Sequence, residues 1–484
     1  MVMETGAAAS NSVPERPHAP SELEINRRKT RRALPALLTV FTLGSLLIQA
    51  FNLVFQNIGD SLSMAQSASL ISTLPGIVLG IVCMLYGTLC DFVSPKRMTM
   101  FGMGALILGS LLGFFGASSF WMVLIGRMIQ VAGAQVSGSV FVVMSVKFLP
   151  AREKAVYLGI YNAIYYLAAA IGVFAGGFIT SFHWKYLFLV PLIAVAFLPT
   201  LIRNTPDVAG MGEKIDVAGI TLFAIFAGLI AIFFSFQNPW LLLATAICGV
   251  LLGIWIAKAP HPFIGKDFLR NKAFMAVLLL QFVFFFFNFA AVPIYNVIGE
   301  NLYGLDLRQI SIYLTVVYVV ATLIGIISGP LVNIFGRYRT LLLSALCMVV
   351  GFAGSAVLIG RGFVVLTVLA CVFIAGVTAC YTPIYDAASD ALPVSENGRG
   401  IGILDLMLNI SSSLGLAVYS ALISSDTFQA GGIFGVEPGA EAASSNMFWF
   451  MAAVSLLAVV LVVVFRKYVT VQRPGTTPEP VATA

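Results

Sequence analysis

Long apolar runs dominate this sequence, and short polar or charged segments separate them from residue 34 to residue 465. Many of the runs reach about 18 residues or more, the length that a helix needs to cross the hydrocarbon core of a bilayer. Alternating strands of about ten residues, the pattern of a membrane β-barrel, are absent. Since backbone polar groups must be satisfied internally in lipid, the runs predict helices. We therefore expect an all-α polytopic membrane protein with about fourteen transmembrane helices.

The spacing of the runs divides the chain into two halves. We expect helices at 34–57, 66–89, 98–117, 120–146, 156–180, 184–202, 216–236, 238–257, 273–296, 309–332, 340–359, 363–385, 401–424 and 445–466. This predicts an N-terminal six-helix bundle at 33–203, an extra helix pair and cytoplasmic linker at 204–272, and a C-terminal six-helix bundle at 273–467. The polar ends, 1–32 and 468–484, are expected to be disordered tails.

Composition excludes a soluble protein. Of the 484 residues, 59% are hydrophobic and only 10% are charged, whereas soluble domains carry about 25% charged residues. The six cysteines form no C-x-x-C pair, and the three histidines lie in a tail or in loops, so we expect no metal site and no cofactor. A nucleotide-binding G-x-x-x-x-G-K-[ST] loop is also absent, which argues against ATP-driven transport.

The positive charges predict the topology. With the N-terminus inside, 23 of the 27 Lys and Arg residues fall on inside segments, and only Lys185, Arg308 and Arg361 lie outside. This asymmetry follows the positive-inside rule. It predicts a multi-pass protein of the cell (inner) membrane with both termini cytoplasmic, and it accounts for the net charge of +6 without nucleic acid. No cleaved signal peptide is expected, because the first helix is its own insertion signal.

Two loops repeat each other at a constant offset. Residues 87–97 read GTLCDFVSPKR, and residues 329–339 read GPLVNIFGRYR. Each loop follows the second helix of its half, and parallel repeats of six-helix halves are a known transporter architecture. The matched pairs are Gly87 and Gly329, Leu89 and Leu331, Asp91 and Asn333, and Arg97 and Arg339.

At these residues the chain resembles the major facilitator superfamily, and within it the fourteen-span drug:proton antiporters that include tetracycline-efflux proteins. The similarity is clearest at 87–97, at RMIQVAGAQ (127–135), at AIGVFAGGFI (170–179) and at SFHWKYLFLVP (181–191). It implies two six-helix bundles with two extra central helices. It also implies a loop motif that latches the outward-facing state, although an ordinary polar turn is the alternative. Phe92 and Ser94 depart from the family pattern, which would weaken the latch. The implied gating residues are Gly87, Asp91, Lys96, Arg97, Gly329, Asn333 and Arg339.

Arg127 is the only basic residue well inside a predicted span, about seven residues or roughly 10 Å from its outer end. Such a charge normally faces a cavity or a partner, and Gln130 shares its helix face. The resemblance gives Arg127 a role in proton transfer or substrate binding, whereas the alternative is a side chain that snorkels to the outer headgroups. Asp405, in the thirteenth span, is the best candidate for a coupling proton, but it could equally cap the start of its helix.

Polar and aromatic side chains on several spans predict a cavity for flat, apolar ligands. Tyr161 and Tyr165 share a stripe of the fifth span. The full expected set is Asn52, Tyr161, Asn162, Tyr165, Asn288, Tyr385 and Asn409. On the fifth span, Gly172, Gly176 and Gly177 form a G-x-x-x-G face that we expect to pack closely against the other half.

The leading functional hypothesis is a secondary transporter of a small lipophilic or aromatic compound, working by alternating access as a proton-coupled exporter. Because Arg127 is the deepest charge and buried acids are few, a neutral or anionic substrate is favoured over a cationic one. The expected partners are this substrate, protons and the lipid bilayer, with no nucleic acid, and the chain is expected to be a monomer and not an enzyme. One alternative is an importer or facilitator of an organic acid or aromatic nutrient, favoured by Val173 where the antiporter fingerprint has Pro. Another is a non-transporting membrane receptor.

Overall fold

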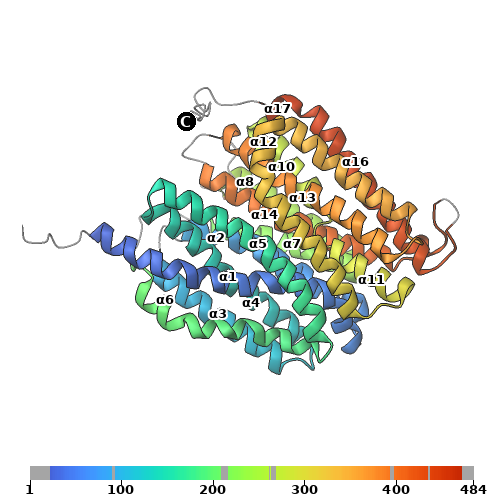
Figure 1. Cartoon of the computed structure of the whole chain (residues 1–484), viewed down its shortest axis with the longest axis horizontal. Helices are drawn as coiled ribbons and strands as arrows, with labels where there is room; N and C mark the ends of the chain where they lie inside the picture. The colour runs from blue at the N-terminus through green and yellow to red at the C-terminus, as the bar shows by residue number, and fades with distance from the viewer. Residues whose placement is uncertain are drawn as a thin grey trace, which may run out of the picture.

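The computed structural model describes residues 22–89, 93–208, 216–260, 262, 269–392, 397–433 and 436–470, and over these ranges the chain is almost entirely helical without a strand. The helices run in an elongated bundle (Figure 1). In chain order they are α1 (Glu22–Ser61), η1 (Ala65–Ser67), α2 (Leu70–Leu89), α3 (Pro95–Phe115), α4 (Phe120–Phe148), α5 (Ala151–Thr180), η2 (Trp184–Phe197), α6 (Leu198–Asn204), α7 (Val217–Phe236), α8 (Pro239–Lys258), α10 (Lys272–Phe285), α11 (Ala291–Tyr303), α12 (Leu307–Val357), α13 (Phe363–Ala391), α14 (Asn397–Ile423), α15 (Asp426–Gln429), α16 (Ala440–Val464) and α17 (Arg466–Thr470).

Twelve helices within the described ranges are long and apolar enough to cross a membrane. One of them, α12, contains two of the predicted spans. The boundary between these spans is at Gly336, where the backbone leaves the helical region (φ 77°, ψ 158°). A positive φ of this size is readily adopted only by glycine. Another predicted span, 273–296, is divided into α10 and α11 by a break at 286–290. Each of the predicted runs thus has a helical counterpart.

The helices form two bundles with an extra pair between them. Helices α1 to α6 pack among themselves, as do α10 to α17, and the two sets meet along α5 with α12, α2 with α14, and α1 with α11. In Figure 1 the blue-to-green set lies below the yellow-to-red set. The pair α7–α8 packs through α7 against both α2 and α14. The fold is therefore the expected one of two six-helix bundles plus two extra helices.

The glycine face of α5 packs differently from our expectation. A Cβ on Gly172 would lie 1.9 Å from the backbone oxygen of Leu46, and one on Gly176 would lie 3.0 Å from Cα of Ala50. Both neighbours are on α1, in the same half. Gly177 alone faces the other half, where a Cβ would lie 2.3 Å from Cβ of Ser311 on α12. The expected packing of the G-x-x-x-G pair against the other half was therefore wrong: the pair holds one bundle together, since α1 is the helix that crosses α5 at this level.

The basic run near the N-terminus is helical, whereas we expected a disordered tail up to residue 32. Helix α1 begins at Glu22, and its first turn contains acidic residues that complement the helix dipole. Contacts with the first half then fix this extension: Arg31 forms an ion pair of 2.6 Å with Glu153 of α5, and Arg27 Nε donates to the Phe148 carbonyl at 3.3 Å. Helix α17 likewise extends to Thr470, two residues past the expected start of the C-terminal tail.

Candidate functional site

Arg127 lies in the interior of α4 and is only 2% exposed, so it does not snorkel to the membrane surface. Its Nη1 donates to Oε1 of Gln130 at 2.5 Å, one helical turn further along. The Gln130 amide is oriented in turn by Ser110 of α3, whose hydroxyl oxygen accepts from Nε2 at 2.9 Å. This chain of bonds fixes the position of the guanidinium.

The charge of Arg127 has no carboxylate partner among the described residues. Its guanidinium carbon lies 4.0 Å from the centroid of the Phe51 ring, a cation–π contact with α1. Its Nε has no hydrogen-bond partner in the described structure. Burial of an unpaired charge is costly, so this donor is well suited to an anion.

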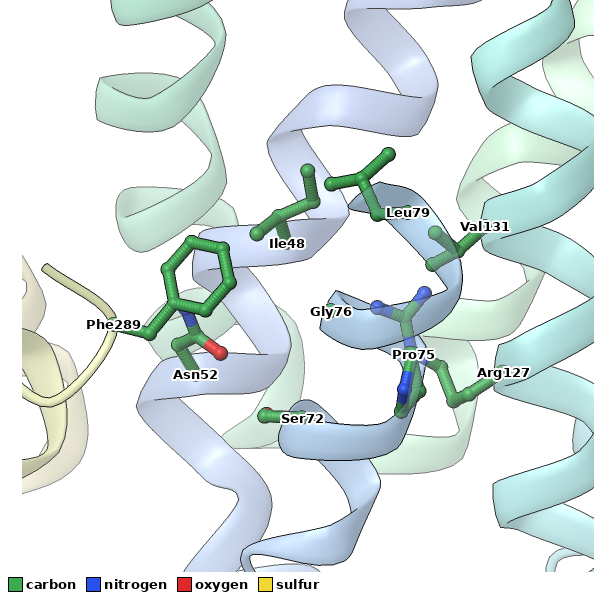
Figure 2. A pocket seen from close by; sticks show the side chains of 9 residues that line it. All are labelled: Ile48, Asn52, Ser72, Pro75, Gly76, Leu79, Arg127, Val131 and Phe289. Carbon is green, nitrogen blue, oxygen red and sulfur yellow. The ribbon is translucent and has the colours of Figure 1, made fainter. Parts of the chain in front are cut away.

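A small cavity lies beside the guanidinium, where Phe289 of the second half meets the first half. Figure 2 shows Arg127 reaching from α4 toward the turn of α2 at Pro75 and Gly76. Phe289, from the break between α10 and α11, enters from the other half. The cavity is lined by Ile48, Asn52, Ser72, Pro75, Gly76, Leu79, Arg127, Val131 and Phe289.

Two polar side chains of this cavity add to its donors. The hydroxyl of Ser72 is buried and has no partner in the described structure. Asn52, which the sequence placed in the cavity, lines it and donates from Nδ2 to Oε1 of Gln49 at 3.3 Å. The first cavity is thus a mostly apolar space with hydrogen-bond donors at one end.

A second small cavity adjoins the first, since Ile48, Leu79 and Val131 line both. Its remaining lining residues are Phe41, Gly44, Ser45, Ala134 and Gln135.

Tyr161 forms an aromatic stack beside this second cavity. Its ring lies 4.5 Å from Phe41 with an interplanar angle of 24°, and 5.5 Å from Phe141 at 19°. Tyr165 extends the stack at 6.5 Å from Phe41. The predicted tyrosine stripe therefore packs against α1 and α4.

Asp405 lies on the other half, where the Tyr385 hydroxyl donates to its carboxylate. The ring of Tyr385 stacks on Tyr381 at 4.1 Å and 21°. Since α14 begins at Asn397, Asp405 lies inside the helix and is not its cap.

Two contacts hold the two halves together near this site. Nδ2 of Asn296 on α11 donates to the Leu53 carbonyl on α1 at 3.2 Å, and both groups are buried. Gly177 contacts Ser311 on the α5–α12 seam. These contacts join the bundles on the side where α11 and α12 meet.

Other predicted cavity residues lie elsewhere. Asn409 packs beside Gly80 of α2 and donates to the Asp405 carbonyl at 2.8 Å, so its amide is engaged within its own helix. Asn288 is half-buried in the break at 286–290. The side chain of Asn162 lies outside the described residues.

The predicted gating loops are only partly described. Asp91 and the surroundings of Gly87 lie outside the described residues, while Lys96 and Arg97 are in the first turn of α3. In the second loop, Gly329 has open space where a Cβ would be. Asn333 and Arg339 are exposed.

Arg337 is a charged residue that our sequence analysis did not single out. It bridges two carboxylates of α13, with Nε 2.5 Å from Asp386 and Nη2 2.6 Å from Asp390. The four-residue spacing of these acids places them on one helix face, a signal that the sequence does contain. Within the described ranges, no three His, Cys, Asp or Glu side chains gather in a way that could hold a metal ion.

Comparison with known proteins agrees with this architecture. The sequence profile of the Major Facilitator Superfamily matches residues 36–212, 215–416 and 277–483. Multidrug resistance protein Stp of Mycobacterium tuberculosis is 24% identical over 369 residues, which cover 72% of this chain and 67% of that protein. Riboflavin transporter RibZ of Clostridioides difficile is 23% identical over 399 residues, covering 81% of this chain and 87% of the relative.

Solved structures share the fold at lower identity. A POT family transporter in complex with 5-aminolevulinic acid has a TM-score of 0.66 at 14% identity, covering 91% of this chain and 97% of that one. A D-xylose-proton symporter has a TM-score of 0.63 at 13% identity, covering 88% and 96%.

Proposed function

The chain belongs to the Major Facilitator Superfamily, and from this premise we propose that it exports a small neutral or anionic aromatic compound in exchange for protons, by alternating access. We assign it to the fourteen-span drug:proton antiporter subgroup, with 33–203 and 273–467 as the two moving bundles. In this proposal it resides in the cell (inner) membrane as a monomer, with both termini cytoplasmic. It acts as a transporter and not as an enzyme.

The observation that carries the substrate class is the unneutralised Arg127 beside the inter-bundle cavity. A buried positive charge without a carboxylate partner repels a cation and attracts an anion, and both effects are strong where the surroundings are of low dielectric constant. The Ser72 hydroxyl and the Arg127 Nε offer two donors to the same ligand. The rings of Phe41 and Tyr161 favour a flat aromatic body.

Proton coupling is assigned to Asp405. It is a half-buried carboxylate on α14, accepting a bond from Tyr385. A carboxylate in this environment can exchange a proton as the two bundles move, because its solvent access changes with them. The names of the relatives, multidrug resistance and riboflavin transport, support small organic substrates as the transported class.

Reconstituted transport tests the substrate class. In proteoliposomes, aromatic carboxylates are expected to compete for uptake of a labelled aromatic acid, whereas quaternary ammonium dyes are not. Arg127→Gln should reduce transport of the acid by roughly tenfold or more, the loss expected for a charged hydrogen bond. Arg361→Gln, at an exposed outer position, is the matched control. Competition by the dyes, or unchanged transport by Arg127→Gln, would overturn the proposal.

Import is the second candidate, favoured by Val173 on α5 and by the absence of a carboxylate at mid-span in the first predicted helix. An imposed pH gradient separates the two directions. Export in exchange for protons predicts that the substrate moves opposite to the protons and accumulates on the side with the higher proton concentration. Asp405→Asn should abolish this coupling but leave the exchange of labelled for unlabelled substrate intact. Accumulation in the same direction as the protons would instead support an importer.

A further inference from the structure

The positive charge of Arg127 is surrounded by neutral groups in the part of the chain that the structure describes. Its Nη1 donates to the amide of Gln130, and its guanidinium carbon lies 4.0 Å from the centroid of the Phe51 ring. Neither neighbour carries a negative charge. Because an arginine side chain stays protonated even when it is buried, a charge at this depth requires a counter-charge.

Two unused hydrogen-bond donors belong to residues that line the first cavity. They are Nε of Arg127 and the hydroxyl of Ser72, and neither has a partner in the described structure. The two residues are 2% and 5% exposed, so bulk water does not satisfy these donors. A buried donor without an acceptor is costly. Two of them beside one cavity therefore indicate that an acceptor occupies it.

The size of the cavity limits what this acceptor can be. The cavity has room for about one water-sized group, and much of its lining is apolar. An aromatic acid needs more space than this arrangement of the two halves leaves. A water molecule fits but carries no charge, whereas a guanidinium in surroundings of low dielectric constant strongly attracts an anion. A chloride ion is only slightly larger than water, and it can accept both hydrogen bonds.

The second half covers this cavity through a glycine of the first half. Phe289 and Arg127 approach the cavity from opposite sides (Figure 2). Gly76 also lines it, and a Cβ at this position would overlap with Oγ of Ser413 on α14 and lie 3.0 Å from the Phe289 ring. The missing side chain thus allows α14 and Phe289 to close over the cavity. An ion inside is enclosed as long as the two halves meet here.

We propose that the first cavity binds one chloride ion, held by Nε of Arg127 and the hydroxyl of Ser72, as the counter-ion of Arg127 while no substrate is bound. The ion is a second ligand of the protein and is distinct from the transported compound. Its part in transport rests on the proposed function, because an acidic substrate would displace it when the halves move apart. Binding itself requires only the two donors and the cavity.

Chloride binding is measured by ³⁵Cl NMR on the purified full-length protein in nanodiscs of zwitterionic lipid, because the chloride line broadens when the ion exchanges with a protein site. Gluconate, which is too large for the cavity, keeps the ionic strength constant. The parent protein should broaden the line in a saturable manner. Bromide, a slightly larger halide, should compete for the same site, whereas gluconate should not.

Variants assign the binding to the two donors. Arg127→Gln should weaken chloride affinity about tenfold or more and Ser72→Ala several-fold, because each removes a hydrogen bond to a charged ligand. Ser72→Ala is the smaller change and keeps the test valid if Arg127→Gln does not fold. Two matched controls should bind chloride as the parent does. They are Arg361→Gln, at an exposed arginine, and Ser344→Ala, at a buried hydroxyl that has no partner in the described structure and does not line the cavity.

The outcomes separate this inference from the proposed function. If the parent shows no saturable broadening, or if the broadening persists in Arg127→Gln or Ser72→Ala, the cavity holds water only and the chloride site is wrong. Cinnamate, an aromatic acid, is then added as a competitor, and displacement of chloride by cinnamate supports both proposals. If chloride binds through both donors and cinnamate does not displace it, the chloride site stands and the anionic substrate at Arg127 is wrong. If cinnamate binds through Arg127 and chloride does not bind, the anionic substrate stands and the chloride site is wrong.

Discussion

Replacing Gly172 by alanine should destabilise the first bundle more than the small size of the change suggests. The added Cβ would lie 1.9 Å from the Leu46 backbone oxygen, whereas real Cβ contacts are not found below 3.0 Å. Helix α5 must therefore move away from α1 by about 1 Å, and an overpacked contact of this kind costs about 1–3 kcal/mol. The obstacle is backbone and not a flexible side chain, so no rotamer change can relieve it.

Thermal unfolding of the purified protein in detergent measures this effect, with two glycines of α12 as controls. A Cβ on Gly329 would meet nothing within 4 Å, and one on Gly325 would lie 3.2 Å from the ring of Tyr166, which can shift. Since alanine favours helix by up to about 1 kcal/mol over glycine, Gly329→Ala should unfold at or above the parent's temperature, and Gly325→Ala close to it. Gly172→Ala unfolding at the parent's temperature would refute the close approach of α1 and α5.

Three further changes have defined expectations. Arg337→Ala leaves two neighbouring carboxylates without their shared cation, so it should cost about 2–4 kcal/mol in the free energy of unfolding, measured by thermal denaturation, with partial recovery in Arg337→Lys. The ion pair with Arg31 lowers the pKa of Glu153 in the folded protein. The ion pair therefore stabilises the fold above the pKa that this carboxyl has in the unfolded chain, and the stabilisation is lost as the pH falls through its folded-state pKa. In Glu153→Gln this loss of stability at acidic pH should disappear from a profile of stability against pH. Ser110→Ala frees the Gln130 amide to rotate and leaves its buried Nε2 without an acceptor, so binding of an aromatic acid should weaken several-fold and the unfolding temperature should fall modestly; an unchanged affinity would contradict the positioning role.

Most of the fold could be predicted because the membrane imposes strong constraints on the sequence. Each apolar run became a helix, and the two halves and the extra pair were visible from run lengths and from the basic linker. The break at 286–290 was not predicted, since the Phe-rich segment there is apolar except for Asn288 and contains neither Gly nor Pro to signal an interruption. The N-terminal extension of α1 was missed because the stabilising partner, Glu153, is remote in sequence.

The candidate site was predicted in part. Arg127 and Asp405 stood out because charges are rare inside spans. In the structure Arg127 is buried within α4, and the Asp405 carboxylate on α14 accepts a hydrogen bond from Tyr385. Which helix a glycine faces, however, depends on how α5 is rotated, and composition does not determine rotation; Gly172 was therefore assigned to the wrong neighbour. The pairing of Arg337 with two acids likewise requires the geometry of α12 and α13.

Alternating access is the central claim, and distances between spin labels on the two faces of the protein test it most directly. In a transport-competent variant without the native cysteines, one label pair is placed at Asp60 and Asn301, on the outer side in the proposed topology, and another at Arg203 and Lys467, on the inner side. We expect the outer distance to increase and the inner distance to decrease, or the reverse, when a transported aromatic acid or a change of pH shifts the equilibrium. If both distances stay constant, or change in the same direction, while transport proceeds, the two bundles do not rock about the Arg127 cavity.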